Sequence, residues 1–315
     1  MLHLRLITPT EQTEDAVRLI RGTLGTTHLC VLSGAARDPV GDVVLCDVAR
    51  EAADDLLSGL QRLGLDTTGS IAVENVDLSL SERADRAEEE APGEGADAVL
   101  WEHLTEATHE ESTLSVTYLS FLTLATMIAA CGVVLDNAVL IVGAMAVGPE
   151  FGPLAGVSTA TVQRRPRLAM RSLIALLVGF AVAMALTVGF SLFMDAVGLF
   201  TEEQLKGERP QTGFVYAPDW FSFVVAVLAG AAGTLSLTSA KSGALVGVAI
   251  SVTTVPAAAN AAVALSYGDT VQTWGSTEQL LLNLLGITLA GTLTLLAQKQ
   301  LWRKQHARLR RRTAA

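Results

Sequence analysis

The chain is short of the residue types from which most active sites are built. It has three cysteines and five histidines among 315 residues. The cysteines, Cys30, Cys46 and Cys131, form no CxxC pair or other metal-ligand spacing. All five histidines fall outside the apolar segments described below. These absences exclude a cysteine-held metal, and they exclude a serine–histidine pair or a histidine-bound metal inside a membrane.

Acidic pairs and nucleotide motifs are lacking as well. Asp136 and Asp195 lie only at the ends of apolar segments, so no two aspartates within those segments can form a protease dyad. No P-loop and no GxGxxG run is present, which argues against transport driven directly by a nucleotide. We therefore expect no enzyme activity, no metal and no cofactor.

Charge and hydropathy divide the chain into two regions. Half of the residues are hydrophobic, the mean hydropathy is +0.42 and the net charge is −10. Residues 1 to about 115 are mixed and acidic, whereas 115 to 300 is almost continuous apolar sequence. This pattern predicts an integral membrane protein with a soluble amino-terminal domain. The basic tail, residues 299–315, is expected to contact anionic lipid rather than nucleic acid.

Residues 1–80 predict a small α+β domain. Apolar β-rich runs alternate with two helical patterns in the order β-α-β-β-α-β, which is that of a ferredoxin-like domain. Gly25 and Gly64 follow the two helical patterns as stop signals. Residues 81–97 are acidic and almost without apolar side chains, so we expect a flexible linker there. Residues 98–114 are expected to form an amphipathic juxtamembrane helix.

The transmembrane domain is expected to occupy residues 115–298. Each apolar segment is near the ~20 residues that a helix needs to cross a bilayer. Six spans fit, at residues 115–135, 137–162, 168–194, 219–238, 242–265 and 278–298.

Loop charges predict the orientation of these spans. The loop after the second span holds Arg164, Arg165, Arg167 and Arg171, whereas the loop between the third and fourth spans is mostly acidic. By the positive-inside rule, we expect a multi-pass protein of the cell membrane with both termini in the cytoplasm.

Two spans are interrupted near the middle of the bilayer. The second span contains Gly148, Pro149, Glu150 and Pro153, and the fifth contains Pro256. Proline removes a backbone donor and clashes with the preceding turn, so each span should be kinked or broken. The two breaks occupy the middle span of each three-span half. This spacing predicts a 3+3 inverted repeat with two broken helices, as in secondary transporters.

The runs DNAVLIVGAMAVGPEFGPLAG and TLSLTSAKSGALVGVAISVTTVPAAANA resemble the hydrophobic membrane family known as domain of unknown function 389. The resemblance covers most of residues 115–300 and implies a membrane domain, without implying a reaction. Two departures from the family pattern matter. Glu150 stands where the family has an apolar residue, and Pro256–Ala257 stands where the family has a double proline.

Glu150 has three interpretations at this stage. It could be a carboxylate that couples protons or cations or binds a substrate, because acidic residues inside membranes concentrate on transport pathways. It could instead pair with Lys241 or with an arginine of the 164–171 loop. A third alternative is a protonated carboxyl that caps the broken helix.

Polar side chains flank the second break and are candidates for the same pathway. They could coordinate ions or anionic groups beside a broken helix, or they could simply bond to their own or neighbouring helices. The candidates are Ser239, Lys241, Ser251, Thr253, Thr254 and Asn260.

Together these features predict a secondary transporter or channel-like protein for a small solute or ion. Its cytoplasmic domain would regulate transport, and a homo-oligomer and a small regulatory ligand of that domain are expected. The alternative is a membrane-anchored ligand sensor or oligomeric scaffold without transport. The complete soluble domain and the scarcity of other charge inside the spans keep that alternative open.

Overall fold

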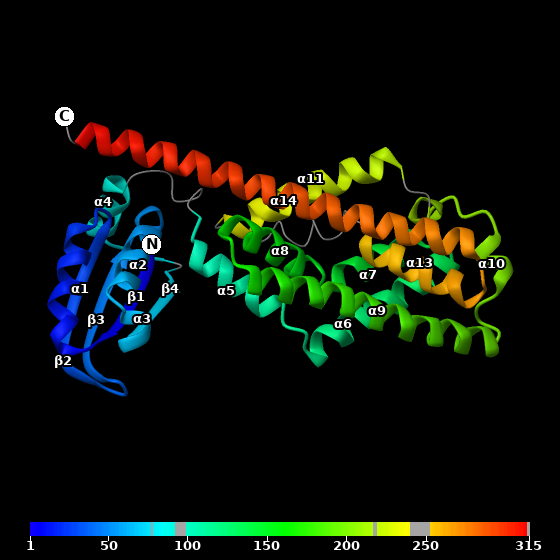
Figure 1. Cartoon of the computed structure of the whole chain (residues 1–315), viewed down its shortest axis with the longest axis horizontal. Coiled ribbons are helices and arrows are strands. Elements are labelled where there is room, and N and C mark those ends of the chain that lie inside the picture. Colours follow the sequence, from blue (N-terminus) through cyan, green and yellow to red (C-terminus); the bar gives the residue numbers. More distant parts are fainter. Residues whose placement is uncertain (77, 92–98, 217–218, 240–252, 314–315) are drawn as a thin grey trace. The chain divides into compact units, whose positions relative to one another are not determined.

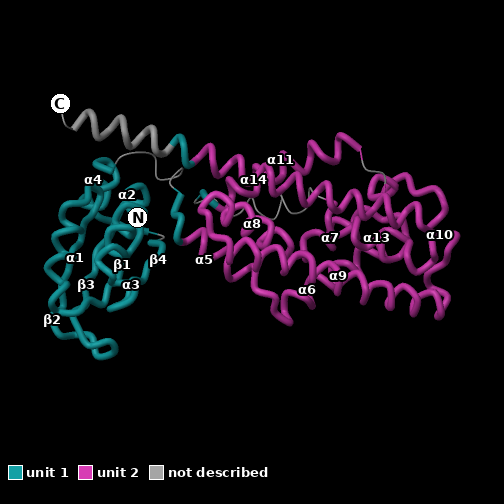
Figure 2. The backbone as a smooth tube through the Cα atoms, in the orientation of Figure 1, with its two compact units in different colours: residues 1–102, 238–240, 299–315 teal, residues 103–237, 241–298 magenta. Residues whose placement is uncertain are grey.

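The computed structural model describes residues 1–76, 78–91, 99–216, 219–239 and 253–313, with side chains as far as residue 301. The chain divides into two compact units, coloured separately in Figure 2. Unit 1 contains Met1–Glu102, Thr238–Ala240 and Lys299–Ala315, and unit 2 contains His103–Leu237 and Lys241–Gln298.

Unit 1 is built on an antiparallel sheet of four strands in the order β2-β3-β1-β4. Helices connect the first strand to the second and the third to the fourth, whereas a short turn joins the second to the third (Figure 1). The elements run β1 (Leu2–Thr8), α1 (Thr10–Gly22), β2 (Thr26–Arg37), β3 (Val40–Val48), α2 (Arg50–Arg62), α3 (Leu65–Thr68) and β4 (Ser70–Asn75).

The core of unit 1 lies between one face of the sheet and the helices. Leu4 and Leu6 of β1 point to the same face, because strand side chains alternate, and both are fully buried. They share one apolar cluster with Ile20 of α1 and Leu56 of α2. Each such leucine contributes about 1.5–3 kcal/mol on burial. Two elements of the predicted domain, a small sheet and packed helices, are therefore present.

The acidic segment after the sheet differs from the expectation of a flexible linker. Glu82–Glu90 form a helix, α4, whose first turn is capped by the Ser81 hydroxyl. Ala84 and Ala87 are buried on one side of α4. Low apolar content suggested a linker, but a capping serine and two alanines suffice for a docked helix. The remaining linker residues, 92–98, lie outside the described part, and β4 ends at Asn75 rather than at the predicted Leu80.

Unit 2 is helical (Figure 1), and small residues let its helices approach closely. A Cβ at Gly156 of α8 would collide with the hydroxyls of Ser112 and Ser172. The helices are α5 (Trp101–Glu111), α6 (Val116–Val134), α7 (Ala138–Val147), α8 (Phe151–Gln163), α9 (Pro166–Ala196), α10 (Glu202–Lys206), the short η2 (Gly213–Val215), α11 (Trp220–Thr238), α13 (Thr254–Ser266) and α14 (Thr270–Thr313).

Four helices in the described residues are long and apolar enough to cross a membrane: α6, α9, α11 and the Thr270–Leu301 part of α14. The bent pair α7 and α8 brings the number to five if it is counted as one span. The fifth predicted span, 242–265, lies partly outside the described residues, and only α13 is seen from it. The six-span count and the inverted repeat therefore stay predictions.

The last span begins earlier than the sequence suggested. We predicted a loop from Ser266 to Glu278, but α14 already begins at Thr270. Gln272 and Ser276 in this first part are buried against other polar side chains rather than exposed to water. Their low hydropathy suggested an exposed loop, but these polar side chains are buried in the first part of α14.

Candidate functional site

The first break separates two half-helices. α7 ends at Val147 and α8 begins at Phe151, and the two are bent by 52°. At 1.5 Å per residue, the ten residues of α7 cover ~15 Å, about half the thickness of a hydrocarbon core. Pro149 cannot donate to the preceding turn, and Pro153 lies in the first turn of α8, where proline is tolerated. The break therefore falls where the sequence placed it, near the middle of the predicted span.

Glu150 of this break points into the protein and contacts the second break. It is 4% exposed. Its Oε1 accepts a hydrogen bond from the Thr254 hydroxyl at 2.6 Å. Within the described residues Glu150 makes no ion pair, and its Oε2 has no hydrogen-bond partner. The arginines of the 164–171 loop are thus not its partners, whereas Lys241 lies outside the described residues and its pairing stays open.

One hydrogen bond does not compensate the burial of this carboxylate. A bond to a charged group contributes about 1.5–3 kcal/mol, while removing a carboxylate from water costs several kcal/mol. Glu150 therefore needs a further partner, which can be a proton, a cation or a group outside the described residues.

The predicted second break falls at the start of α13, and the residues that precede Thr253 in that span lie outside the described part. Thr253 precedes the helix, Thr254 begins it, and Pro256 occupies its first turn. The Thr253 hydroxyl accepts hydrogen bonds from Asn283 Nδ2 at 2.9 Å and from Gln279 Nε2 at 3.5 Å. The thirteen residues of α13 cover only ~20 Å, too short to cross a bilayer alone.

Two polar residues of α14 belong to this site and were missed in the sequence. Gln279 and Asn283 are buried, and Oε1 of Gln279 has no partner among the described residues. They lie one turn apart in an otherwise apolar span, so they face the same side of the helix. The four-residue spacing of these two amide side chains can be read in the sequence, but a hydropathy average over the span hides it.

Of the residues predicted for the pathway, the structure brings together Gly148, Pro149, Glu150, Thr253, Thr254 and Pro256. Pro153 is buried in the first turn of α8. Ser239 directly follows α11, while Lys241 and Ser251 lie outside the described residues. Asn260 is six residues beyond Thr254, about 9 Å along α13, and belongs to a different network.

That second network surrounds Arg209, in the loop after α10. Its guanidinium donates to Asn260 Oδ1 at 2.8 Å and to Gln272 Oε1 at 2.6 Å. Asn260 in turn donates to the Ser276 hydroxyl at 2.7 Å. Burial lowers the pKa of Arg209, although nearby Tyr216, Asp136 and Asp269 act in the opposite direction. An arginine stays charged at neutral pH, so this end of the unit contains a buried cation held by neutral amides.

A cavity of about 380 Å³ lies beside the first break. It is bounded by the end of α5, the start of α6 and the α7–α8 junction, where Gly148 and Pro149 line it. Glu110 and Glu111 are exposed at its edge, and the ring of Tyr118 forms part of its wall. The cavity therefore connects acidic side chains of α5 with the backbone next to Glu150.

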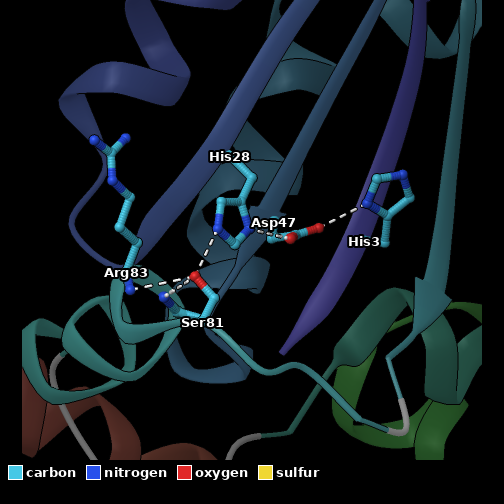
Figure 3. A network of polar contacts seen from close by, with 6 residues as sticks. His3, His28, Asp47, Ser81 and Arg83 are labelled. Carbon is cyan, nitrogen blue, oxygen red and sulfur yellow. Dashed lines mark hydrogen bonds and ion pairs between the residues drawn. The ribbon is translucent and has the colours of Figure 1, made fainter.

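Unit 1 carries a separate polar network on its sheet (Figure 3). Asp47 accepts from Nδ1 of His3 at 2.6 Å and of His28 at 2.7 Å. His28 Nε2 contacts the Ser81 hydroxyl at 3.0 Å. Burial alone would raise the pKa of Asp47, but the hydrogen bonds from the two histidines lower it.

The order serine–histidine–aspartate is that of a hydrolase triad, but here the serine has a structural task. Its oxygen accepts from the amides of Arg83 and Ala84, which cap α4. Because those bonds occupy its lone pairs, the network holds the start of α4 on the sheet.

Comparison with known proteins supports the resemblance to an uncharacterised membrane family. Residues 145–289 match the family described as Domain of unknown function (DUF389). The matched residues include the whole of the first break, α8, α13 and both α14 residues of the site. The resemblance predicted from the two sequence runs is therefore confirmed.

A relative is found in Methanocaldococcus jannaschii. The chain is 26% identical over 228 residues to the "Uncharacterized protein MJ0678" of that organism, covering 70% of this chain and 68% of the relative. No solved structure matches the chain. The descriptions of the family and of the relative state no function, so the functional argument depends on the site.

Proposed function

We propose that the protein is a secondary transporter or channel-like protein for a small solute or ion, with its pathway at the junction of the two breaks. The observation that carries this proposal is the hydrogen bond between Glu150 and Thr254. It joins an acidic residue at the end of one half-helix to the first residue of another. Discontinuous helices that meet near the bilayer midplane are the arrangement from which transporters build substrate and ion sites.

The two breaks support an inverted repeat of three plus three spans, because each interrupts a span of the DUF389 domain and both contribute to one polar cluster. In this arrangement the basic loop at Arg164–Arg171 lies in the cytoplasm, as do both termini. A cysteine introduced at Arg165 that reacted with an impermeant reagent from outside intact cells would contradict this orientation.

Unit 1 is proposed to be a cytoplasmic regulatory domain of the ferredoxin-like type. Its strand order β2-β3-β1-β4 and its helix positions support that assignment. Homo-oligomerisation and a small regulatory ligand of this domain belong to the same proposal. A monomer in both mild detergent and lipid, measured by mass, would count against the oligomer.

Replacement of Glu150 by Gln tests the transport proposal. The variant keeps the size of the side chain and its ability to accept from Thr254, but it cannot carry a negative charge or exchange a proton. In proteoliposomes containing a trapped pH-sensitive dye, wild-type protein should give proton flux on imposing a sodium, potassium or pH gradient. Glu150→Gln should remove this flux while expression and assembly remain normal.

Glu203→Gln is the matched control, because Glu203 is an exposed acid of α10 outside the predicted spans. It should leave flux unchanged. Unchanged flux in a correctly assembled Glu150→Gln protein would remove Glu150 from the mechanism. That result would favour the ligand sensor or scaffold over a transporter.

A further inference from the structure

We propose that His28 is a proton-controlled latch, which holds the start of α4 on the sheet of unit 1 while it is neutral and releases it when it is protonated. The chain continues from α4 to α5 and then to the long apolar helices. A change at α4 therefore occurs next to the connection between the two units. Its effect on transport rests on the proposed function, whereas the latch itself does not.

His28 occupies an irregular position in β2. Its φ is 50°, in the left-handed region that residues other than glycine seldom adopt. The pairing of β2 with β3 shifts register between Thr27 and Cys30, and His28 lies inside that shift. Bulges of this kind redirect a side chain. Here the imidazole reaches both Asp47 of β3 and Ser81 at the start of α4 (Figure 3).

The two contacts of His28 determine where its hydrogen lies. An ionised carboxylate only accepts hydrogen bonds, so Nδ1 of His28, 2.7 Å from Asp47 Oδ2, carries the hydrogen. A neutral imidazole has one N–H group, so its Nε2 is then an acceptor. The Ser81 hydroxyl, 3.0 Å away, donates to it. In the neutral network each donor therefore faces an acceptor.

The oxygen of Ser81 has no lone pair left for a further donor. It accepts from the amide of Arg83 at 3.3 Å and from that of Ala84 at 3.4 Å, and these two bonds cap α4. A hydroxyl oxygen has two lone pairs, so both are in use. A proton added to Nε2 of His28 would make two donors face each other. Ser81 would then have to turn its own hydrogen away and give up one cap bond to accept from the imidazolium.

The protonated imidazole is better accommodated when α4 is released. Its Nδ1–H keeps the bond to Asp47 and gains an opposite charge there. Water can take up the Nε2–H group, because the His28 side chain is 35% exposed. Protonation and docking of α4 therefore oppose each other, as two linked equilibria. Histidine is the side chain that changes charge between pH 5 and 8, so such a latch responds in the physiological range.

α4 is held weakly enough for one hydrogen bond to matter. Its buried side chains are Ala84 and Ala87, while its other side chains are charged and exposed. A buried methyl group removes much less apolar area from water than a leucine does. The bonds at the start of α4 are therefore a large share of what positions the helix.

The charged groups of the sheet around His28 do not produce the same response. Burial alone would raise the pKa of Asp47, but the hydrogen bonds from its two histidines lower it, so this carboxylate stays ionised above pH 5. His3 of β1 donates to the other oxygen of Asp47, and no hydrogen bond joins it to Ser81 in the part of the chain that the structure describes. Glu74 of β4 pairs with His3 in the strand register rather than with His28.

The charged groups of α4 titrate outside this range or are directed elsewhere. The Arg83 side chain is directed away from Asp47 (Figure 3). Glu82 pairs with Arg86 at 3.9 Å, and Glu88 pairs with the amino group of Met1 at 2.9 Å. Reference carboxyl groups titrate near pH ~4 and amino groups near pH ~8. Loss of these contacts would therefore follow strong acid or alkali, not the change from neutral to mildly acidic pH.

Hydrogen exchange of the α4 amides in the full-length protein tests the latch between pH ~7.5 and ~5.5. After correction for intrinsic rates, we expect protection in wild type to fall by about three- to tenfold toward the acidic end, the equivalent of one lost hydrogen bond. His28→Asn should remove this pH-dependent step. Asparagine tolerates positive φ and carries no charge, so the variant separates protonation from backbone strain.

His3→Asn is the matched control. His3 donates to the same carboxylate at 2.6 Å, and its side chain is exposed to a similar extent, 37% against 35% for His28. The step should survive in this variant. A step that disappears in His3→Asn would belong to the carboxylate and would overturn the latch. A step that persists in His28→Asn, or protection in wild type that does not change with pH, would also overturn it.

Ser81→Asp should reverse the direction of the pH effect. Aspartate caps helices about as well as serine, but its carboxylate only accepts hydrogen bonds. It therefore matches a protonated His28, and α4 should be better protected at the acidic end. A general loss of stability would not imitate this reversal, because the comparison is made within one variant. Protection that still falls with acid in Ser81→Asp would contradict the latch.

The latch and the transport proposal fail separately. Absence of flux in proteoliposomes, with the exchange step present, would reject transport and leave the latch in place. Glu150-dependent flux in a protein whose α4 shows no such step would reject the latch alone.

Discussion

The polar groups near the two ends of α6 differ in how far they are hydrogen-bonded to one another. At its start, an open cavity is lined mainly by apolar groups, with Glu110 and Glu111 at its edge. Beyond its last turn, Asp136 accepts from the backbone and hydroxyl of Thr212. Close by in sequence, Arg209 is held between Asn260 and Gln272. The nineteen residues between these ends cover ~28 Å, about one bilayer core.

This difference indicates which end of α6 could accept a ligand. Around Arg209 most polar groups are paired with one another, although Nε of Arg209 has no partner among the described residues, so a ligand there would have to break existing bonds. At the cavity, Glu110 and Glu111 are exposed, so a ligand would not have to break such bonds. Under the transport proposal, the cavity next to Gly148 and Pro149 would be the side from which Glu150 is reached.

We expect the largest effect from removing the buried guanidinium of Arg209, which lies in the network beyond the last turn of α6. Arg209→Ala leaves the oxygens of Asn260 and Gln272 buried without their donor. Each unsatisfied group costs about 1–3 kcal/mol, so we expect the free energy of unfolding to fall by about 3 kcal/mol. Denaturant or thermal unfolding of the purified protein in detergent measures this loss.

Lys206→Ala provides the control for that measurement. Lys206 pairs with Glu202 one turn earlier on α10, and both side chains are about half exposed. Exposed ion pairs contribute little, so stability should hardly change. A similar loss in both variants would show that the Arg209 network is not especially important, and the contrast between the ends would lose its basis.

A second prediction compares added volume at the two ends. Ala264 of α13 is completely buried in the apolar core, so Ala264→Phe should destabilise by about 1–3 kcal/mol through overpacking. Ala146 lines the cavity, where a phenyl ring has room, and Ala146→Phe should cost less than about 0.5 kcal/mol.

The same pair of variants separates packing from function. Ala146→Phe should leave unfolding near normal, and under the transport proposal it should reduce flux if the cavity beside the first break belongs to the pathway. Equal destabilisation by the two substitutions would mean that the cavity near the start of α6 is closed in solution. The two ends of α6 would then not differ in packing.

Much of the fold could be read from local sequence rules. Apolar β-rich runs located the four strands, and glycines with positive φ, Gly25 at 84° and Gly64 at 78°, follow α1 and α2 as predicted. Continuous apolar runs located α6, α9 and α11 within a few residues. The helix α4 was missed, because a short helix of charged residues is stabilised by its cap and by docking rather than by hydropathy.

The site could be predicted only in part, because its partners are brought together by tertiary packing. Proline and glutamate inside an apolar run identified the first break, and the distance between breaks suggested that they were related. The choice of Thr254 as the partner of Glu150 depends on how α13 packs beside α7 and α8, which no local pattern encodes. Arg209 lies in the loop between the third and fourth predicted spans, and no sequence pattern indicates that this arginine is only 8% exposed.

We expect the smallest effect from changes in the Asp47 network, whose polar contacts lie near the surface of unit 1. Comparison with the buried Arg209 network tests whether burial strengthens such contacts. The Asp47 network in unit 1 is partly open to water, since the His3 and His28 side chains are 37% and 35% exposed. Water can replace such contacts, so their loss should loosen α4 locally rather than unfold the unit. Hydrogen exchange of the α4 amides in the full-length protein reports this directly.

The direction of the acid effect follows from the lowered pKa of Asp47. A carboxyl whose folded pKa is depressed stabilises the fold above its unfolded value, near 3.9, and this contribution is lost as pH falls through the folded pKa. The α4 amides should therefore exchange faster at acidic pH after correction for intrinsic rates. Asp47→Asn should reproduce this at neutral pH, by about tenfold or less, since a partly exposed hydrogen bond to a charge is worth at most ~1.4 kcal/mol here. Exchange unchanged by Asp47→Asn would show that α4 is held by Ala84 and Ala87 alone. A global loss of stability as large as that of Arg209→Ala would show instead that exposure to water does not weaken such a network.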